Sequence, residues 1–316
     1  MDMNGVSYIR VFAPATVANV AAGFDVLGFA LEKPGDTVEL FRRGEGGVRI
    51  KGITGDGGRL PLATDKNTAS VAVSRFLEDM GSPFGVDIVI RKEMPLSSGL
   101  GSSAASSVAA VYGINVMAGN PLPLEGLIKY TLEAERVACG SAHADNSAPS
   151  LLGGFVLIRS YSPLDVIKLP VPRGLSCAVV HPHTEVNTGD ARRILKKEIS
   201  LSNAIKQWGN LAALVAALFK GDFELLGRSL EDSIAEPVRS LLIPGFTEVK
   251  KAAMSAGALG CSISGSGPSV FALSSSLEGA EKIGRAMERA FGKIGLECDL
   301  YISRVNEIGP RVVEKG

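Results

Sequence analysis

Residues 95–105, with the sequence PLSSGLGSSAA, constrain the fold of this chain more than any other segment. They follow residues 85–91 (GVDIVIR), where apolar and polar side chains alternate with the period of a half-buried strand. Residues 102–118 then form an almost uncharged run, which predicts a buried helix that ends at residues 119–121 (GNP). A strand, a glycine-rich turn and a helix N-terminus together present backbone N–H groups and the positive helix dipole to an anion. The segment is therefore predicted to bind phosphate.

Two better-known phosphate-binding patterns do not fit this segment. A Walker A loop needs Gly-Lys-Ser/Thr at its end, and no lysine follows Gly101. Gly99, Gly101 and Ala104 match the dinucleotide pattern G-x-G-x-x-A, but that motif requires an acidic residue at the end of a second strand about 20 residues later. Here residues 122–138 predict a helix instead. Taken alone, the segment also remains compatible with a structural loop rich in serine and glycine.

Length and composition favour a soluble globular protein that acts on small molecules. With 316 residues, the chain is expected to form two domains or one large one, and PVPRG at residues 170–174 predicts a division into 1–174 and 175–316. The chain contains 33 Lys and Arg and 33 Asp and Glu, so no overall charge attracts nucleic acid or anionic lipid. No apolar run reaches the roughly 18 residues of a membrane span. Residues 1–10 lack a signal sequence, which predicts a cytoplasmic location without membrane or nucleic-acid partners.

Polar residues stand out in two further segments of the first half. Asn19 and Asp25 are the strongly polar side chains of the otherwise apolar residues 13–25, so they are candidates for ligand contact, although Asp25 also suits an ordinary turn. Residues 140–154 (GSAHADNSAPSLLGG) are expected to form a loop in which His143, Asp145 and Asn146 crowd together. Glu135, on the helix before this loop, is either a solvated glutamate or an oxygen ligand for Mg²⁺ bound to ATP.

The second half of the chain is expected to alternate strands and helices. Arg192 follows a Thr-Gly-Asp turn and Arg239 follows Glu-Pro-Val; each suits a carboxylate or phosphate clamp, and each by itself also suits a surface position. Residues 260–273 (GCSISGSGPSVFAL) form a second loop of serine and glycine that is favourable for anions. The four cysteines lie far apart without a C-x-x-C pair, so neither disulfides nor a zinc site is predicted.

Three segments together resemble a known family. PATVANVAAGFD from Pro14, PLSSGLGSSAA from Pro95 and GCSISGSGPSVFAL from Gly260 are similar, in order and spacing, to the three motifs of the GHMP small-molecule kinases. These are named for galactokinase, homoserine kinase, mevalonate kinase and phosphomevalonate kinase. The resemblance covers nearly the whole chain and implies an α+β fold, with a left-handed β-α-β unit in the N-terminal domain and a ferredoxin-like C-terminal domain. It also implies ATP and Mg²⁺ as cofactors and a homodimer.

A finer resemblance points to the homoserine kinases within this superfamily. HADNSAPSLLGG from His143, NTGDAR from Asn187 and EPVRSLLIPGF from Glu236 are similar to their substrate-binding segments. This implies ATP-dependent phosphorylation of the L-homoserine side-chain hydroxyl in threonine biosynthesis. It implies nucleotide contacts from Asn67, Pro95, Leu96, Ser97, Ser98, Gly99, Leu100, Gly101, Ser102, Ser103, Ala104 and Ala105, with Mg²⁺ held by Glu135 and by Ser103 or its neighbour Ser102. It implies an amino-acid site of Asn19, Asp25, His143, Asn146, Arg192 and Arg239, and catalytic roles for Asn146, Thr188 and Glu135, with Thr188 near the transferred phosphoryl group.

The chemistry of L-homoserine agrees with these residue types. Its carboxylate requires cations, which Arg192 and Arg239 supply, and its ammonium requires an anion, which Asp25 supplies. Where mevalonate kinase and galactokinase resemble each other in offering an aspartate base, this chain has Asn146, which is expected to orient the hydroxyl while the proton leaves late to a phosphate oxygen or water. Asp145 is expected to turn away into a structural hydrogen bond, although it remains an alternative base.

Two other functions compete with this interpretation. Another GHMP kinase would act on mevalonate or a similar alcohol, and it should lack the paired arginines. A GHMP-like binding protein without catalysis should have lost its phosphate and metal positions. Gly99, Gly101, Ser103 and Glu135 are all present, which favours an active enzyme.

Overall fold

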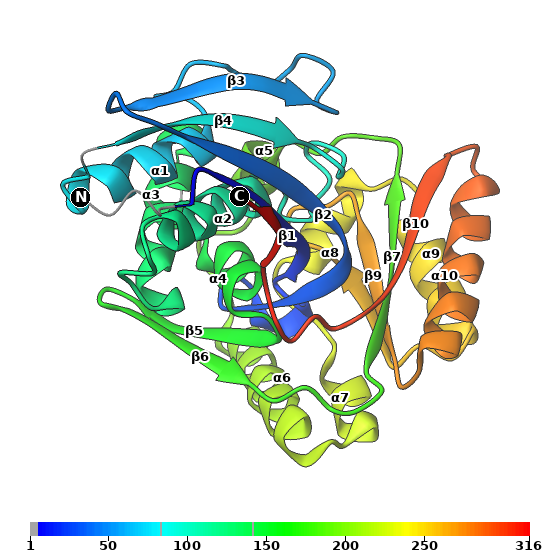
Figure 1. Ribbon diagram of the computed structural model, residues 1–316. Helices are drawn as coiled ribbons and strands as arrows, with labels where there is room; N and C mark the ends of the chain where they lie inside the picture. The colour runs from blue at the N-terminus through cyan, green and yellow to red at the C-terminus, as the bar shows by residue number, and fades with distance from the viewer. Residues whose placement is uncertain (1–5, 83, 141) are drawn as a thin grey trace.

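The computed structural model describes residues 6–82, 84–140 and 142–316, and this part of the chain forms two β-sheets covered by helices (Figure 1). The first sheet has seven strands in the order β11-β1-β2-β4-β3, and the long strand β2 also pairs with β5, which pairs with β6. Its strands are β1 (Tyr8–Ala18), β2 (Leu27–Arg43), β3 (Val48–Thr54), β4 (Gly85–Arg91), β5 (Phe155–Tyr161), β6 (Leu164–Leu169) and β11 (Arg311–Lys315).

Helices α1 (Thr68–Asp79), α2 (Ser102–Met117) and α4 (Ala144–Leu152) pack against this sheet, and α3 (Leu124–Cys139) packs against these three helices. Helix α2 contacts β1 and β2 and is buried along most of its length, as its uncharged sequence predicts. Strands β3 and β4 are parallel and are joined through α1. They form the β-α-β unit for which the family resemblance implies a left-handed crossover.

The second sheet has the order β10-β7-β9-β8, and each neighbouring pair of its strands is antiparallel. The sequence of elements β7 (Ser176–Pro182), α9 (Phe246–Ser255), β8 (Gly260–Ile263), β9 (Val270–Ser274), α10 (Leu277–Gly292) and β10 (Cys298–Arg304) is the β-α-β-β-α-β pattern of a ferredoxin-like domain. Between β7 and α9 the chain inserts α5 (Thr188–Arg193), α6 (Leu201–Lys220), α7 (Phe223–Ser229), α8 (Glu236–Arg239) and the short 3-10 helix η2 (Ser240–Leu242). The predicted α+β architecture is confirmed.

Strand β7 lies between two apolar clusters. Cys177 and Val179 pack into the large cluster that includes the first sheet, whereas Ala178 and Val180 pack into the smaller cluster with α9 and α10. This division follows from the alternation of side chains along a strand. The last strand, β11, returns to pair with β1 in the first sheet. The division of the chain at residue 174 stays a prediction.

Residues 140–154 differ from the sequence-based expectation of a loop. Their C-terminal part forms α4, with Pro149 inside the helix. The small and turn-forming residues of this segment have little intrinsic helix preference, but α4 is buried between β1, β2 and α2, and tertiary packing overrides propensity there. Ser150, for example, is fully buried and its hydroxyl donates 2.9 Å to the carbonyl oxygen of Pro14.

The sequence predicted neither disulfides nor a membrane span, and two findings on the described part of the chain bear on these points. Cys177, Cys261 and Cys298 are free thiols, and the side chain of Cys139 lies outside the described part. No helix in the described ranges has both the length and the apolarity of a membrane span.

Candidate active site

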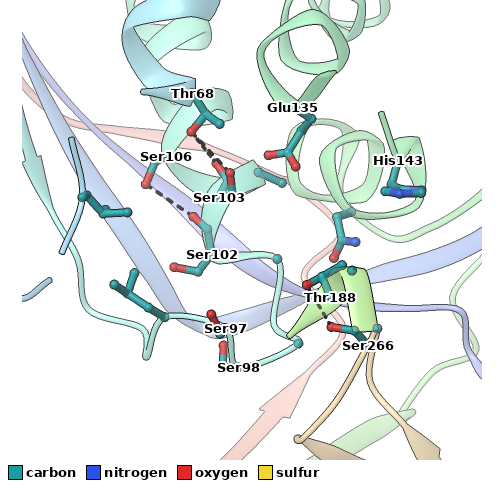
Figure 2. A pocket seen from close by; sticks show the side chains of 18 of the residues that line it. Thr68, Ser97, Ser98, Ser102, Ser103, Ser106, Glu135, His143, Thr188 and Ser266 are labelled. Atoms are coloured by element: carbon teal, nitrogen blue, oxygen red, sulfur yellow. Dashed lines mark hydrogen bonds between the residues drawn. The ribbon is translucent and has the colours of Figure 1, made fainter. Parts of the chain in front are cut away.

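A cavity of about 810 Å³ lies where the two halves of the chain meet. Its walls come from the loop before α2, the ends of α1 and α3, the start of α4, helices α5 and α8, and the loop between β8 and β9. Figure 2 shows serine and threonine side chains from both halves facing this space, with Glu135 and His143 on its other side. Residues from distant parts of the sequence therefore form one polar cavity.

The glycine-rich loop forms one wall of this cavity and contacts the second glycine-rich loop. Gly99 has a φ of +78°, and a Cβ added there would lie 2.4 Å from the carbonyl oxygen of Ser264. The hydroxyl of Ser264 donates 2.7 Å to the carbonyl oxygen of Gly99. At the start of α2, the N-cap Gly101 provides no side-chain cap. The first N–H groups of α2 are thus left for a ligand, as expected at an anion-binding helix N-terminus.

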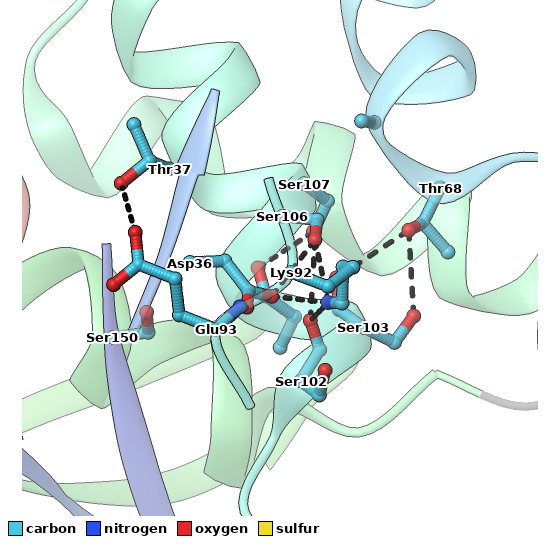
Figure 3. A network of polar contacts seen from close by, with 12 residues as sticks. Asp36, Thr37, Thr68, Lys92, Glu93, Ser102, Ser103, Ser106, Ser107 and Ser150 are labelled. Carbon is cyan, nitrogen blue, oxygen red and sulfur yellow. Dashed lines mark hydrogen bonds and ion pairs between the residues drawn. The ribbon is translucent and has the colours of Figure 1, made fainter. Parts of the chain in front are cut away.

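A buried ion pair supports the same helix turn from below (Figure 3). The ammonium of Lys92 contacts the carboxylate of Asp36, and it also donates 2.8 Å to the carbonyl oxygen of Ser102 and 2.8 Å to the hydroxyl of Ser106. Both charged side chains are almost completely buried. Burial lowers the pKa of Lys92, and the charge of Asp36 opposes this change. The network fixes the first turn of α2 against β2 and β4.

Oxygen atoms suited to Mg²⁺ lie beside this turn. The hydroxyl of Ser102 is buried without a hydrogen-bond partner, whereas that of Ser103 lies 3.4 Å from the hydroxyl of Thr68. Figure 2 shows the side chain of Glu135 pointing from α3 toward this turn. A carboxylate, a free hydroxyl and a neighbouring phosphate site are the ligands that Mg²⁺ takes in phosphoryl-transfer enzymes. The residues present therefore fit this ion, and both Ser102 and Ser103 stay candidates for the hydroxyl ligand.

The segment between β1 and β2 has a strained backbone. Asn19, Val20, Ala21 and Asp25 all have positive φ values, and for Val20 the value is +40°. Such conformations cost about 1–3 kcal/mol each and gather at functional sites. The side chain of Asn19 holds the segment in place, because it donates 2.7 Å to the carbonyl oxygen of Gly265 and accepts 3.0 Å from the backbone N–H of Asp25.

Asp25 is the centre of a charged cluster in the cavity. Both of its carboxylate oxygens contact the guanidinium of Arg192, and its Oδ1 lies 3.8 Å from Nδ1 of His143. The Nη1 of Arg192 lies 3.2 Å from Nε2 of His143. Burial lowers the pKa of His143, so its ring is neutral at pH 7 and Nε2 accepts a hydrogen bond from the arginine.

Arg239 provides a second cation beside this cluster. It is 5% exposed, its guanidinium lies over the ring of Phe24 at 4.9 Å, and its Nη1 donates 3.0 Å to the carbonyl oxygen of Gly265. Its Nε donates 3.1 Å to the carbonyl oxygen of Ala191. These contacts leave further N–H groups of Arg239 available on the cavity side. Arg192 and Arg239 together present two guanidinium groups to the cavity.

Asp145 and Asn146 are adjacent in the first turn of α4 but differ in environment. Oδ1 of Asn146 accepts a 2.8 Å hydrogen bond from the hydroxyl of Thr16. Asp145 is almost fully buried, its Oδ1 has no hydrogen-bond partner, and burial, with the charge of Asp25, raises its pKa to about 7. Asp145 is among the residues that line the cavity, and its turn into a structural hydrogen bond stays a prediction.

Comparisons with known proteins identify the family of this site. The family models "GHMP kinases N terminal domain" and "GHMP kinases C terminal" match residues 67–154 and 214–294. A homoserine kinase from Chlorobium phaeobacteroides (strain DSM 266) is 52% identical over 317 residues, covering 96% of this chain and 99% of that protein. A crystal structure of homoserine kinase from Cytophaga hutchinsonii is 58% identical, with a TM-score of 0.96 and 99% of both chains covered. The chain belongs to the homoserine kinases of the GHMP kinase family.

A more distant structure is similar in fold alone. The mevalonate kinase of L. major, in complex with R-mevalonate, is 16% identical and has a TM-score of 0.70 over 93% of this chain and 95% of that protein. As a member of the GHMP family, the present chain is an ATP-dependent kinase. The predicted superfamily, fold and type of activity are thus confirmed.

Most residues that the sequence nominated line the cavity of this kinase. They are Asn19, Asp25, Asn67, Leu96, Ser97, Ser98, Gly99, Gly101, Ser102, Ser103, Ala104, Glu135, His143, Asn146, Thr188, Arg192 and Arg239. Pro95, Leu100 and Ala105 do not border it; Leu100 and Ala105 are buried in the apolar core. Asn67 also caps α1 by accepting 3.1 Å from the N–H of Ala69. The individual roles of these residues stay predictions.

Sequence reasoning missed three residues that position the site. Lys92 directly follows β4, and only the fold brings Asp36 to it. Thr16 lies in an apolar strand, and nothing in its surroundings in the sequence singles it out. One signal in the sequence could have indicated Lys92: it is a lysine that lies just before the glycine-rich loop, next to the predicted anion site.

Proposed function

We propose that this kinase transfers the γ-phosphoryl group of ATP to the side-chain hydroxyl of L-homoserine, giving O-phospho-L-homoserine in threonine biosynthesis. The relatives named homoserine kinase support this substrate. The observation that carries the proposal is the charged cluster of Asp25, His143, Arg192 and Arg239 in the cavity that also contains the phosphate loop. Opposite charges at one end of a polar cavity complement a zwitterion with an alcohol. A cytoplasmic location, expected from residues 1–10, and a homodimer, implied by the resemblance, stay predictions.

On binding, L-homoserine would replace the ion pair between Asp25 and Arg192 with two contacts of its own. Its ammonium binds Asp25, while its carboxylate binds Arg192 and Arg239. Each charged protein group then keeps an opposite charge nearby, which a partly buried site requires. Mevalonate carries a carboxylate but no ammonium, so its binding would separate Arg192 from Asp25 without replacing the cation. The cluster therefore favours an amino acid over a simple hydroxy acid.

The rest of the cavity would position the two reacting groups. The N–H groups at the start of α2 bind phosphate oxygens, and Mg²⁺ held by Glu135 and Ser102 or Ser103 would neutralise phosphate charge. Because Oδ1 of Asn146 is bonded to Thr16, its Nδ2 is the group left to donate to the substrate hydroxyl oxygen. An amide accepts no proton, so the hydroxyl proton leaves late to a phosphate oxygen or water. The hydroxyl of Thr188 lies 3.3 Å from that of Ser266 in the second glycine-rich loop, which supports a place for Thr188 near the transferred phosphoryl group.

The test is Mg²⁺-dependent ADP release by the purified protein with L-homoserine, D-homoserine, L-serine, L-threonine and mevalonate in parallel. We expect strong release with L-homoserine alone and an acid-stable phosphate monoester as the product. Release with mevalonate instead would retain the kinase fold and reject the amino-acid site. ATP binding without release for any alcohol would favour a non-catalytic member of the family.

A further inference from the structure

The hydroxyl of Tyr161 connects two segments that form the amino-acid end of the cavity. It donates 2.8 Å to the carbonyl oxygen of Asp25, and it accepts a 3.3 Å hydrogen bond from the backbone N–H of Ala144. Tyr161 is the last residue of β5 and does not itself border the cavity. One hydroxyl therefore uses its donor and an acceptor position on two separate walls of the site.

The first of these bonds holds the strained turn that carries Asp25. The φ of Asp25 is +60°, and its backbone N–H donates 3.0 Å to Oδ1 of Asn19. The next carbonyl group, that of Val26, accepts 2.7 Å from the N–H of Ile158 in β5. The bond from Tyr161 is thus a second attachment of the turn to β5. Because a strained backbone persists only where its surroundings fix it, loss of this hydroxyl should let the Asp25 carboxylate move.

The second bond fixes the start of α4. The first N–H groups of a helix have no partner within the helix, and Ala144 is the first residue of α4. Its N–H obtains a partner from β5 through the hydroxyl of Tyr161. The same turn of α4 carries Asn146, the amide that is proposed to orient the substrate hydroxyl. Tyr161 therefore contacts the backbone on both sides of the substrate, near its ammonium site and near its hydroxyl site.

Both contacts would persist while the substrate binds. In the structure the guanidinium of Arg192 contacts both carboxylate oxygens of Asp25. A substrate carboxylate would draw Arg192 away, and the substrate ammonium would take its place beside Asp25. Asn19 and Tyr161 bind the backbone of Asp25 rather than its carboxylate, so this exchange leaves their hydrogen bonds intact. They would keep Asp25 in position at the stage when Arg192 no longer does.

The Tyr161 hydroxyl keeps its proton, which its donor role requires. Burial, with the charge of Asp145, raises the pKa of Tyr161 above its ordinary value. The residue as a whole is 42% exposed, so water can replace part of each lost hydrogen bond and the effect of removing the hydroxyl should be moderate.

We propose that Tyr161 is a positioning residue that sets the separation between Asp25 and Asn146, and thereby the length of the amino acid that the kinase accepts. This rests on the proposed function, because it requires an amino-acid substrate with a side-chain hydroxyl. L-Serine is one methylene shorter than L-homoserine, and 5-hydroxy-L-norvaline is one methylene longer. With both ends of the site fixed, neither places its hydroxyl beside Asn146 while its ammonium contacts Asp25. A misplacement of about 1 Å can cost on the order of a hundredfold in rate.

The test compares Tyr161→Phe with the wild type in Mg²⁺-dependent ADP release, with L-homoserine, L-serine and 5-hydroxy-L-norvaline as substrates. Phenylalanine keeps the ring and removes only the hydroxyl. We expect kcat/KM for L-homoserine to fall about five- to twentyfold, the range of one or two lost hydrogen bonds, while KM for ATP stays unchanged. The preference for L-homoserine over each of the other two amino acids should fall roughly threefold or more, because the site no longer fixes the length of its substrate.

Tyr301→Phe is the matched control, because Tyr301 lies on β10 away from the cavity and its hydroxyl bonds to Asp299. It should leave all three rates unchanged. If the wild type is active on L-homoserine and Tyr161→Phe keeps the same preference, the positioning role is wrong and the proposed function stands. A wild type that phosphorylates none of the three amino acids would reject the proposed function and the role of Tyr161 with it. An equal loss for all three substrates, or loss of folding in circular dichroism, would assign the hydroxyl to the stability of the fold instead.

Discussion

The hydroxyl of Thr16 donates a 2.8 Å hydrogen bond to Oδ1 of Asn146, joining the first strand of the chain to the first turn of α4. Gly101 makes this contact sterically possible. A Cβ at Gly101 would lie 2.2 Å from the Thr16 hydroxyl and 2.7 Å from Oδ1 of Asn146. The phosphate loop and the proposed hydroxyl-orienting amide are thereby fixed against each other.

The first prediction concerns Thr16. Thr16→Val removes the donor at nearly constant volume, so the Asn146 amide loses its fixed orientation. A hydrogen bond of this kind is worth about 1 kcal/mol, and we expect kcat to fall about five- to tenfold with little change in KM for ATP. Thr16→Ser keeps the hydroxyl and should stay close to the wild type. Equal rates for the valine and serine variants in steady-state assays would remove the orienting role.

The second prediction concerns Arg192. Arg192→Lys replaces a planar fork by a single ammonium, so the two-point contact now made to Asp25 can no longer be made to a substrate carboxylate. We expect KM for L-homoserine to rise about ten- to a hundredfold, the range of a lost charge-assisted hydrogen bond, with KM for ATP unchanged. Arg193→Lys is the matched control, because Arg193 is 80% exposed and pairs with Asp190. A similar rise in both variants would show that the effect does not depend on the contact of Arg192 with the substrate carboxylate.

The third prediction concerns the ion pair beneath the phosphate loop. Lys92→Met leaves the carboxylate of Asp36 buried and uncompensated, which should lower the free energy of unfolding by about 3–5 kcal/mol in urea denaturation. Adding Asp36→Asn removes the buried charge and should restore much of this loss. KM for ATP should remain elevated in both variants, because the carbonyl of Ser102 has lost its donor. If Lys92→Met has the same free energy of unfolding as the wild type, the ion pair between Lys92 and Asp36 does not stabilise the fold.

The fourth prediction concerns the pH dependence of stability. The pKa of Asp145 is about 7 in the folded protein, with 3.8 as its ordinary value. Between these values the folded state holds a proton that the unfolded state has released, so the free energy of unfolding decreases as pH rises from about 4 to about 7. The decrease is on the order of 4 kcal/mol at its full extent. Asp145→Asn cannot titrate, so in urea denaturation the wild type should lose stability relative to this variant between about pH 4 and pH 7. If the free energy of unfolding depends on pH in the same way for both proteins, the pKa of Asp145 lies near its ordinary value.

The sequence correctly predicted the strand and the helix on either side of the phosphate loop. The alternation in GVDIVIR predicted β4 with the bounds that the structure has, and the uncharged run after it predicted α2, because side-chain periodicity and burial are local properties of the chain. The three glycine-rich segments also indicated the family and its chemistry before any contact was known.

Other features became visible only in three dimensions. Residues 144–152 have turn-forming side chains, and their helix exists because β1, β2 and α2 bury it. Residues 201–220 form the helix α6, and which of its faces is exposed depends on the face that α7 and the 3-10 helix η1 (Ala21–Gly23) cover.

The sequence by itself determined the helices and strands with strong periodicity, the glycine positions of the phosphate loop and the kinase family. Only the tertiary structure decided that Asp36 neutralises Lys92, that Thr16 orients Asn146, and that Asp145 remains buried beside the substrate cavity with a raised pKa. The physical reason is the same in each case. Hydrogen bonds, ion pairs and desolvation depend on distances between residues far apart in the chain, and the local pattern of a sequence does not specify those distances.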